Sequence, residues 1–142
     1  MSEIMVLGYD GSESSNAALE QTVRRAPKLG AEVVVVFAYY VTPLGGGEAS
    51  HDYRMALEEV GRHELGRAVA DLEAAGIAVS SRIEQGKPAD VILAVAEEVG
   101  AGTIVVGTVG ENPISGALLG SVVLKLVQRS SIPLLIVPTR EA

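Results

Sequence analysis

Hydrophobic residues in this chain form five short runs, and the stretches between them repeat apolar residues with the period of a helix. A continuous apolar run without alternation is typical of a strand that is covered on both faces of a parallel sheet. We therefore predict five strands, at residues 4–7, 33–38, 77–83, 103–106 and 132–137. The third run alternates in part, which indicates an edge strand with one covered face.

The first helix is predicted between the first two strands. Ser12 or Ser14 can cap its start, because a serine hydroxyl accepts a hydrogen bond from a backbone N–H of the first turn. Gly30 suits its end, where a left-handed residue is favoured. Pro27 lacks an N–H and crowds the preceding turn, so we expect a kink at this residue or an early end of the helix.

Three further helices complete the alternation of elements. They are predicted at residues 51–75, at residues 89–99 and from Gly120-Ser121 onward. Regular alternation of strands and helices implies parallel strands with helices on both faces of the sheet. The expected fold is α/β: a single domain, residues 1–142, built on an open, Rossmann-like, five-stranded parallel sheet.

Composition narrows the classes of partner. The 142 residues carry a net charge of −7, which disfavours binding to nucleic acid or to an anionic membrane surface through bulk electrostatics. The chain has no cysteine, which excludes disulfides and thiolate chemistry. No apolar run approaches the ~20 residues that span a bilayer, and the first residues show no signal-peptide pattern. We therefore expect a cytoplasmic protein.

Familiar catalytic signatures are missing from the sequence. The chain contains no GxxxxGK[ST] phosphate loop, no GxGxxG after the first strand and no GxSxG elbow. His51 and His63 lie out of phase on one predicted helix, so we expect no metal-binding residues. No nucleophile, general base or carboxylate pair stands out. We therefore expect no catalytic residue, and no enzyme activity beyond slow hydrolysis.

The most informative pattern lies between the fourth strand and the last helix. Two residues separate Gly107 from Gly110, and nine separate Gly110 from Gly120-Ser121. Glycines let the backbone approach a ligand closely, and a helix that starts at Ser121 would direct its first N–H groups at a phosphate. Asp10 directly follows the first strand and could lie at the same edge of the sheet, where ligands bind in such folds.

These residues resemble the universal stress protein family, whose nucleotide-binding members carry the motif G-x2-G-x9-G-[S/T]. The chain matches this motif in both spacing and residue identity. Three further parts agree, namely Asp10 within GYDGS, the Gly86-Lys87-Pro88 turn and the final IPLLIV. The resemblance covers essentially the whole chain and implies the adenine nucleotide alpha hydrolase-like form of the fold.

The resemblance also implies a stress-response or signalling module that binds ATP at the carboxyl edge of the sheet. In this interpretation the motif glycines and Ser121 hold ribose and phosphates, Asp10 accepts a hydrogen bond from the ribose or the adenine side, and main-chain groups near Ala38 meet the adenine edge. The implied binding residues, with two valines lining the pocket, are Asp10, Ala38, Val106, Gly107, Gly110, Gly120, Ser121 and Val122. The simpler alternatives are that the glycines only shape a turn and that Asp10 only caps one.

The motif loop departs from the family pattern in its charge. Residues 108–119 contain no Lys or Arg and one acid, Glu111. A triphosphate would depend on backbone N–H groups, on a helix dipole that contributes about 0.3–1 kcal/mol, and on a divalent cation such as Mg²⁺ or Mn²⁺. We therefore expect modest affinity for ATP, with AMP or ADP binding comparably.

The resemblance further implies a homodimer that pairs through the edge strand beginning at Ile132 and ending at Val137. An exposed edge strand this apolar would otherwise promote aggregation. Two rival functions remain open. The first is a dimeric interaction module that binds no nucleotide and keeps a vestigial loop. The second is an adenylate-transferring enzyme, which would need an additional substrate-binding segment.

Overall fold

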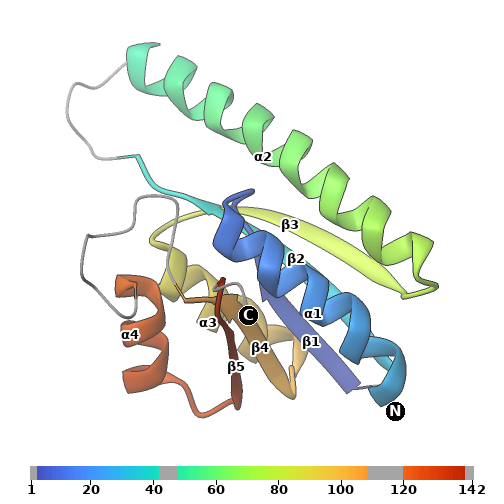
Figure 1. Cartoon of the computed structure of the whole chain (residues 1–142). Helices are drawn as coiled ribbons and strands as arrows, with labels where there is room; N and C mark the ends of the chain where they lie inside the picture. The colour runs from blue at the N-terminus through green and yellow to red at the C-terminus, as the bar shows by residue number, and fades with distance from the viewer. Residues whose placement is uncertain (1–2, 42–47, 109–119, 140–142) are drawn as a thin grey trace.

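Five parallel strands form a single sheet in the computed structural model, which describes residues 3–41, 48–108 and 120–139 (Figure 1). The sheet order is β3-β2-β1-β4-β5. The strands are β1 (Glu3–Gly8), β2 (Ala31–Tyr39), β3 (Val79–Gln85), β4 (Thr103–Gly107) and β5 (Leu134–Val137). The predicted α/β fold with an open parallel sheet is confirmed, and β3 lies at an edge, as its partial alternation indicated.

Four helices connect the strands and cover both faces of the sheet (Figure 1). They are α1 (Glu13–Leu29), α2 (Glu48–Ala74), α3 (Pro88–Val99) and α4 (Ser121–Arg129). Helices α1 and α2 pack on one face, and α3 and α4 pack on the other. Successive strand residues point to opposite faces, so Met5 and Leu7 join the first core and Val6 joins the second. Because both faces of β1 are buried, its run shows no alternation.

The ends of α1 follow the local chemistry of its sequence. The hydroxyl of Ser12 accepts a hydrogen bond from the N–H of Ser15 at 3.1 Å, so Ser12 rather than Ser14 is the N-cap. The helix continues through Pro27, so of the two expected outcomes, a kink or an early end, the early end is wrong. Pro27 lies in the last turn, where its missing N–H removes only one hydrogen bond, and Gly30 then closes the helix with a φ of 63°.

Two strands start later than their apolar runs suggested. β3 begins at Val79, although its run begins at Ile77, and β5 begins at Leu134, after Ile132 and Pro133. Ile77 is buried in the core beneath α1 and α2. Its hydrophobicity therefore reflects packing of the turn before the strand rather than the strand itself.

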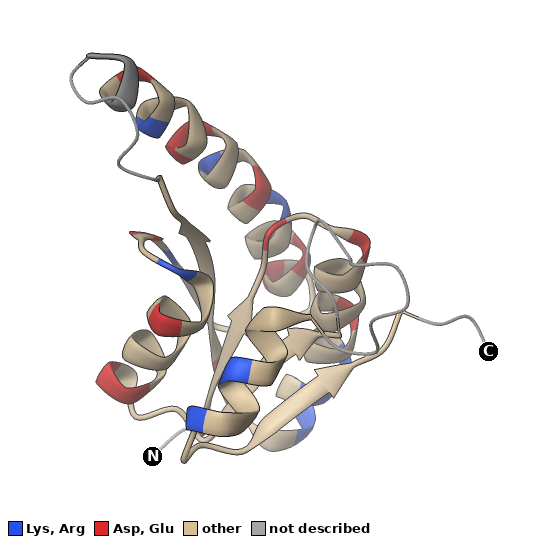
Figure 2. Ribbon diagram, turned by 90° about the vertical axis from the view of Figure 1, so that its left-hand side faces the viewer, with Lys and Arg blue, Asp and Glu red and all other residues tan. Residues whose placement is uncertain are grey.

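The longest helix, α2, carries charged residues along its length (Figure 2). Among the described residues, no helix is long and apolar enough to cross a membrane. In contrast to α2, helix α4 carries only basic charges, Lys125 and Arg129. Arg129 forms an ion pair with Asp90 in the first turn of α3, which links the two helices on their shared face of the sheet.

Candidate functional site

A cavity of about 510 Å³ lies at the carboxyl ends of β1, β2 and β4. The chain leaves β1 toward β2 on one side, and β4 occupies the other side, so the strand order reverses at β1. Ligands of open α/β sheets bind at such a reversal, because the connections leave in opposite directions and open a crevice between them. The cavity therefore occupies the place where the fold favours a binding site.

Six of the eight residues proposed from the sequence line this cavity. They are Asp10, Ala38, Val106, Gly107, Gly120 and Val122. Ser121 begins α4 directly after Gly120, but its side chain is exposed and it does not line the cavity. Gly110 lies outside the described residues, so the structure leaves its role as an expectation.

Three helices begin at the cavity. Ser12, Pro88 and Gly120 stand at the starts of α1, α3 and α4, and all three line it. The first N–H groups of a helix have no intrahelical partner and carry partial positive charge. Among the described residues, no side chain caps the start of α3 or α4. The backbone therefore provides donors for an anion in a chain whose net charge is negative.

Gly107 is required by packing at the end of β4. An ideal Cβ at this position would lie 2.6 Å from the carbonyl carbon of Ser14, and closer still to two oxygens of that serine. Atoms do not approach one another so closely, so a larger residue would push β4 away from the start of α1. The close approach explains this glycine without a ligand, although the residue also borders the cavity.

Hydrogen bonds fix the start of α4 against the sheet. The N–H of Thr108 donates to the carbonyl of Val137 at 3.1 Å, and the N–H of Gly120 donates to the carbonyl of Thr108 at 2.7 Å. The backbone at Gly120 is extended, with φ −72° and ψ 163°. These bonds hold the first N–H groups of α4 beside the end of β4.

Asp10 has a structural role and also borders the cavity. Its Oδ1 accepts a hydrogen bond from the N–H of Ser12 at 3.0 Å, and its own N–H donates to the hydroxyl of Ser15 at 3.3 Å. The carboxylate therefore shapes the turn between β1 and α1, as the simpler alternative held. A carboxylate has two oxygens and several lone pairs, so this role leaves it able to accept a further hydrogen bond from a ligand.

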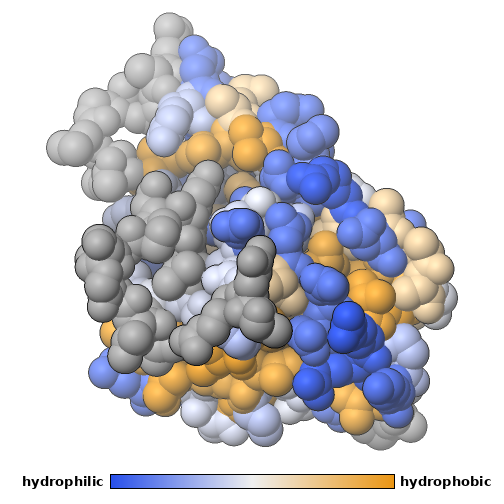
Figure 3. All heavy atoms as spheres, in the orientation of Figure 1, coloured by the Kyte–Doolittle hydropathy of each residue, from blue (hydrophilic) through white to orange (hydrophobic). Residues whose placement is uncertain are grey.

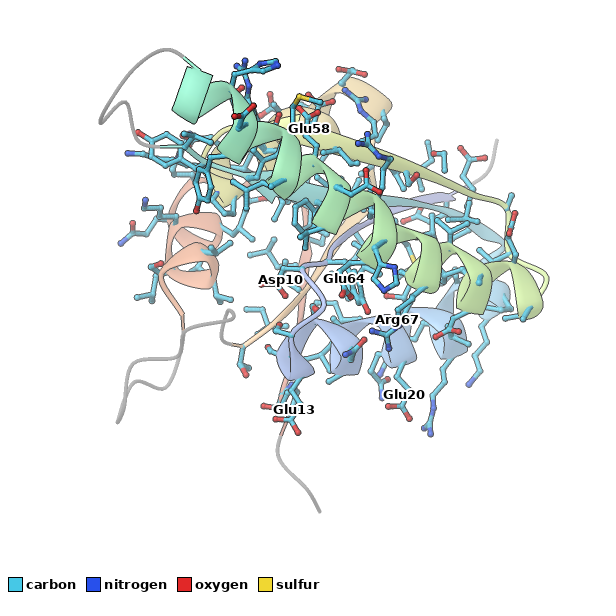
Figure 4. The ribbon with its side chains drawn as sticks, turned by 90° about the horizontal axis from the view of Figure 1, so that it is seen from above. Asp10, Glu13, Glu20, Glu58, Glu64 and Arg67 are labelled. Atoms are coloured by element: carbon cyan, nitrogen blue, oxygen red, sulfur yellow. The ribbon has the colours of Figure 1, made fainter. Side chains whose placement is uncertain are left out.

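Helix α2 passes over the same turn. Gly11 has a φ of 82°, and an ideal Cβ there would lie 2.7 Å from the Glu64 carboxyl carbon. Figure 4 shows the Glu64 side chain beside Asp10, and Arg67 forms an ion pair with Glu64 at 3.4 Å. Within the described ranges, no group of three His, Cys, Asp or Glu side chains could hold a metal ion.

All four tyrosines of the chain line the cavity, which the sequence interpretation missed. Tyr9 and Tyr39 are buried, and their hydroxyls donate to Asn16 at 2.6 Å and to Glu58, respectively. Burial raises the pKa of both hydroxyls above the ordinary value of 10.0, and the bond to Glu58 raises that of Tyr39 further. Tyr9, Tyr39 and Tyr40 lie within two residues of the end of an apolar run, and that position was the available signal.

The other two tyrosines form the exposed rim of the cavity. Tyr40 is 47% exposed and Tyr53 is 57% exposed. The ammonium nitrogen of Lys87 lies 5.7 Å from the centre of the Tyr40 ring, within range of a cation–π interaction. No Lys or Arg of the described residues lines the cavity itself.

Comparison with known proteins gives a family and related structures. Residues 1–138 match the universal stress protein family. The chain is 29% identical over 136 residues to universal stress protein MJ0531 of Methanocaldococcus jannaschii, covering 94% of this chain and 80% of that protein.

Two solved structures share the fold and hold adenine nucleotides. The structure of a universal stress protein in complex with cAMP is 31% identical to this chain, with a TM-score of 0.71 and coverage of 98% of both chains. The structure of a family member from Arabidopsis thaliana with AMP bound is 20% identical, with a TM-score of 0.73, and covers 99% of this chain and 93% of that one.

Proposed function

Because the chain belongs to the universal stress protein family, we propose that its cavity binds an adenine nucleotide and that the protein acts as a nucleotide-dependent module in a stress response. Related structures with cAMP and AMP support nucleotide binding in this family. The proposal assigns binding rather than catalysis to the site.

The order of chemical groups along the sheet edge carries this proposal. Tyr39 and Tyr40 stand at the end of β2, Asp10 follows β1, and Gly107 with the start of α4 stands at β4. A nucleotide has a base, a ribose and a phosphate in the same order. Two strand spacings separate β2 from β4, which is about 10 Å. The edge therefore offers an aromatic surface, a hydrogen-bond acceptor and backbone donors at suitable intervals.

No Lys or Arg is among the described residues that line the cavity, and this affects how many phosphates of a nucleotide the site can hold. A phosphate here would be held by backbone N–H groups at the starts of α3 and α4, and each helix dipole contributes about 0.3–1 kcal/mol. These contributions stabilise the charge of one phosphate better than the larger charge of three. We expect AMP to bind at least as well as ATP without metal, and ATP to gain affinity when Mg²⁺ or Mn²⁺ neutralises its phosphates.

Isothermal titration calorimetry with AMP, ADP and ATP, each with and without Mg²⁺, tests the proposal. We expect one nucleotide per chain, weaker binding of CMP, and a gain from Mg²⁺ that is confined to ADP and ATP. No heat with any adenine nucleotide at millimolar concentration would overturn the proposal and favour an interaction module. Exchange of pyrophosphate into ATP would instead favour an adenylate-transferring enzyme.

We also propose that two copies pair through β5. The strand is an edge of the sheet, and its hydrogen-bonding groups on one side are already used by β4. Figure 3 shows apolar atoms gathered on the side of the molecule that carries α4 and β5. Leu124 and Val127 of α4 are 48% and 54% exposed there. A second copy that covers this edge and face would remove both from water.

A further inference from the structure

Two large aromatic side chains remain in water at the rim of the cavity. About half of the surface of Tyr40 and of Tyr53 is exposed, although aromatic rings are among the side chains that gain most from burial. They come from different elements, the end of β2 and the first turns of α2, and both face the same cavity. A ligand that covers these rings would gain apolar contact.

Neighbouring contacts hold Tyr40 in place. The ammonium group of Lys87 lies over its ring, at 5.7 Å from the centre. The turn that carries Lys87 is fixed to the end of β2, because the N–H of Gly86 donates to the carbonyl of Tyr39 at 2.7 Å. Lys87 therefore contacts the Tyr40 ring from a turn whose backbone is bonded to the end of β2.

The helix that carries Tyr53 is also held against β2. The Tyr39 hydroxyl donates to Glu58 of α2, five residues beyond Tyr53. An ideal Cβ on Gly61 of α2 would lie 2.7 Å from the ring of Phe37 in β2, so the helix and the strand are in close contact. The positions of Tyr40 and Tyr53 are thus set by the fold, and no loop movement is needed to bring them to one cavity.

We infer that Tyr40 and Tyr53 form a stacking subsite for the base of the bound nucleotide, with Lys87 positioning Tyr40. The inference rests on the proposed function. It assigns to the two tyrosines the base of the nucleotide, which the motif glycines do not contact in the proposed arrangement. Every base has a π-face that stacks on an aromatic ring, and a purine presents a larger face than a pyrimidine. The subsite therefore favours purines, and main-chain hydrogen bonds near Ala38 are left to distinguish adenine.

Titration of AMP into matched variants tests the subsite. Tyr53→Leu removes the ring but keeps an apolar side chain, and we expect it to weaken AMP binding about ten-fold. Tyr53→Phe keeps the ring and should bind AMP within about two-fold of the original protein. Met55→Ala is the control, because Met55 is 53% exposed on the same helix and does not line the cavity; its affinity should be unchanged.

A second pair of variants addresses Lys87. Lys87→Gln removes the cation from the Tyr40 ring, and Lys87→Arg keeps it. If Lys87 acts by positioning Tyr40, the glutamine variant binds AMP more weakly than the original protein, and the arginine variant binds it as well as the original protein does. Both substitutions lie at an exposed turn, and unfolding curves will show that the variants are folded.

Tyrosine spectroscopy gives an independent readout. The chain has no tryptophan, so its near-ultraviolet circular dichroism reports on tyrosine surroundings, and AMP should change that spectrum less in Tyr53→Leu. If the original protein binds AMP and Tyr53→Leu and Tyr40→Leu both bind it equally well, the inference is overturned and the proposed function stands. If the original protein binds no nucleotide, both fall.

Discussion

Gly107 and Ser14 are so close that only hydrogen can occupy the Cβ position of Gly107. The ideal Cβ lies 2.6 Å from the carbonyl carbon of Ser14, a backbone atom that cannot rotate away. Gly107, the first glycine of the motif, therefore has two roles: it allows β4 to pack against α1, and it lines the cavity. A substitution at this position would change the stability of the fold, so its effect on binding cannot be interpreted until stability has been measured.

We predict that Gly107→Ala lowers the free energy of unfolding by about 1–3 kcal/mol or more, because the added methyl group overpacks the contact with Ser14. Gly66→Ala is the matched control. Gly66 is exposed in the middle of α2 with nothing near its Cβ position, so alanine should raise stability by about 0.5–1 kcal/mol. Urea denaturation measures both changes, and equal effects would contradict the packing argument.

Gly120 offers a cleaner test of the motif. Its backbone is extended, so other residues can adopt its conformation. We predict that Gly120→Val abolishes AMP binding, because a branched side chain would fill the approach to the first N–H groups of α4, while the fold is kept with a loss of about 1 kcal/mol from the poorer N-cap. Gly120→Ser, a good N-cap of small size, should retain more affinity. Calorimetry with AMP measures both, and unchanged affinity in the valine variant would remove this glycine from the site.

Two substitutions separate the two roles of Asp10, which are to accept the turn hydrogen bond from Ser12 and to bind the ligand. Asn can still accept the hydrogen bond from Ser12, whereas Ala cannot. We predict that Asp10→Asn leaves the thermal unfolding temperature nearly unchanged but weakens binding of AMP, since a charged acceptor for the ribose hydroxyl is lost. Asp10→Ala should lower both. The Asn variant should bind 2′,3′-dideoxy-AMP as well as the original protein does; a loss there would show that Asp10 does not contact the ribose.

The buried tyrosines predict a dependence of stability on alkaline pH. Burial raises the pKa of Tyr9 and of Tyr39 above 10.0, with the hydrogen bond to Glu58 as a second cause for Tyr39. The folded state then holds these protons more tightly than the unfolded chain. Their contribution to stability is full below pH 10 and is lost as pH rises through the higher folded values.

Urea denaturation at a series of pH values around 10 measures this loss. Tyr39→Phe removes one of the two groups and should make the decline shallower. In a spectrophotometric titration, Glu58→Gln should lower the pKa of Tyr39. A free energy of unfolding that stays constant through this range would contradict the assignment.

Dimerisation through β5 predicts a mass of twice 14.7 kDa in analytical ultracentrifugation. The carbonyl of Pro133 accepts from Ile104 of β4 and that of Val137 accepts from Thr108, directly after β4. The alternate residue Ile136 therefore presents its backbone to the outer edge. Ile136→Pro removes an outward N–H without removing a bond to β4, because proline is tolerated at the outer side of an edge strand. We expect this variant to be monomeric and Ile136→Val to remain dimeric. A monomeric original protein would exclude the β5 dimer.

The sequence by itself determined the elements and the class of fold. Hydrophobic runs and helix periods depend on residues close together in the chain, as do the N-cap at Ser12 and the closing residue Gly30. The interval from Gly107 to Ser121 is likewise a local pattern, and it sufficed to indicate the family.

Only the tertiary structure decided which residues share the site. The order β3-β2-β1-β4-β5 is set by pairing between distant segments, and this order places Tyr40, Asp10 and Gly107 along one edge. Tyr53 joins them because α2 packs against β2, which no local pattern specifies. The contact of Gly107 with Ser14 joins residues far apart in the chain. It arises because the end of β4 lies against the first turn of α1.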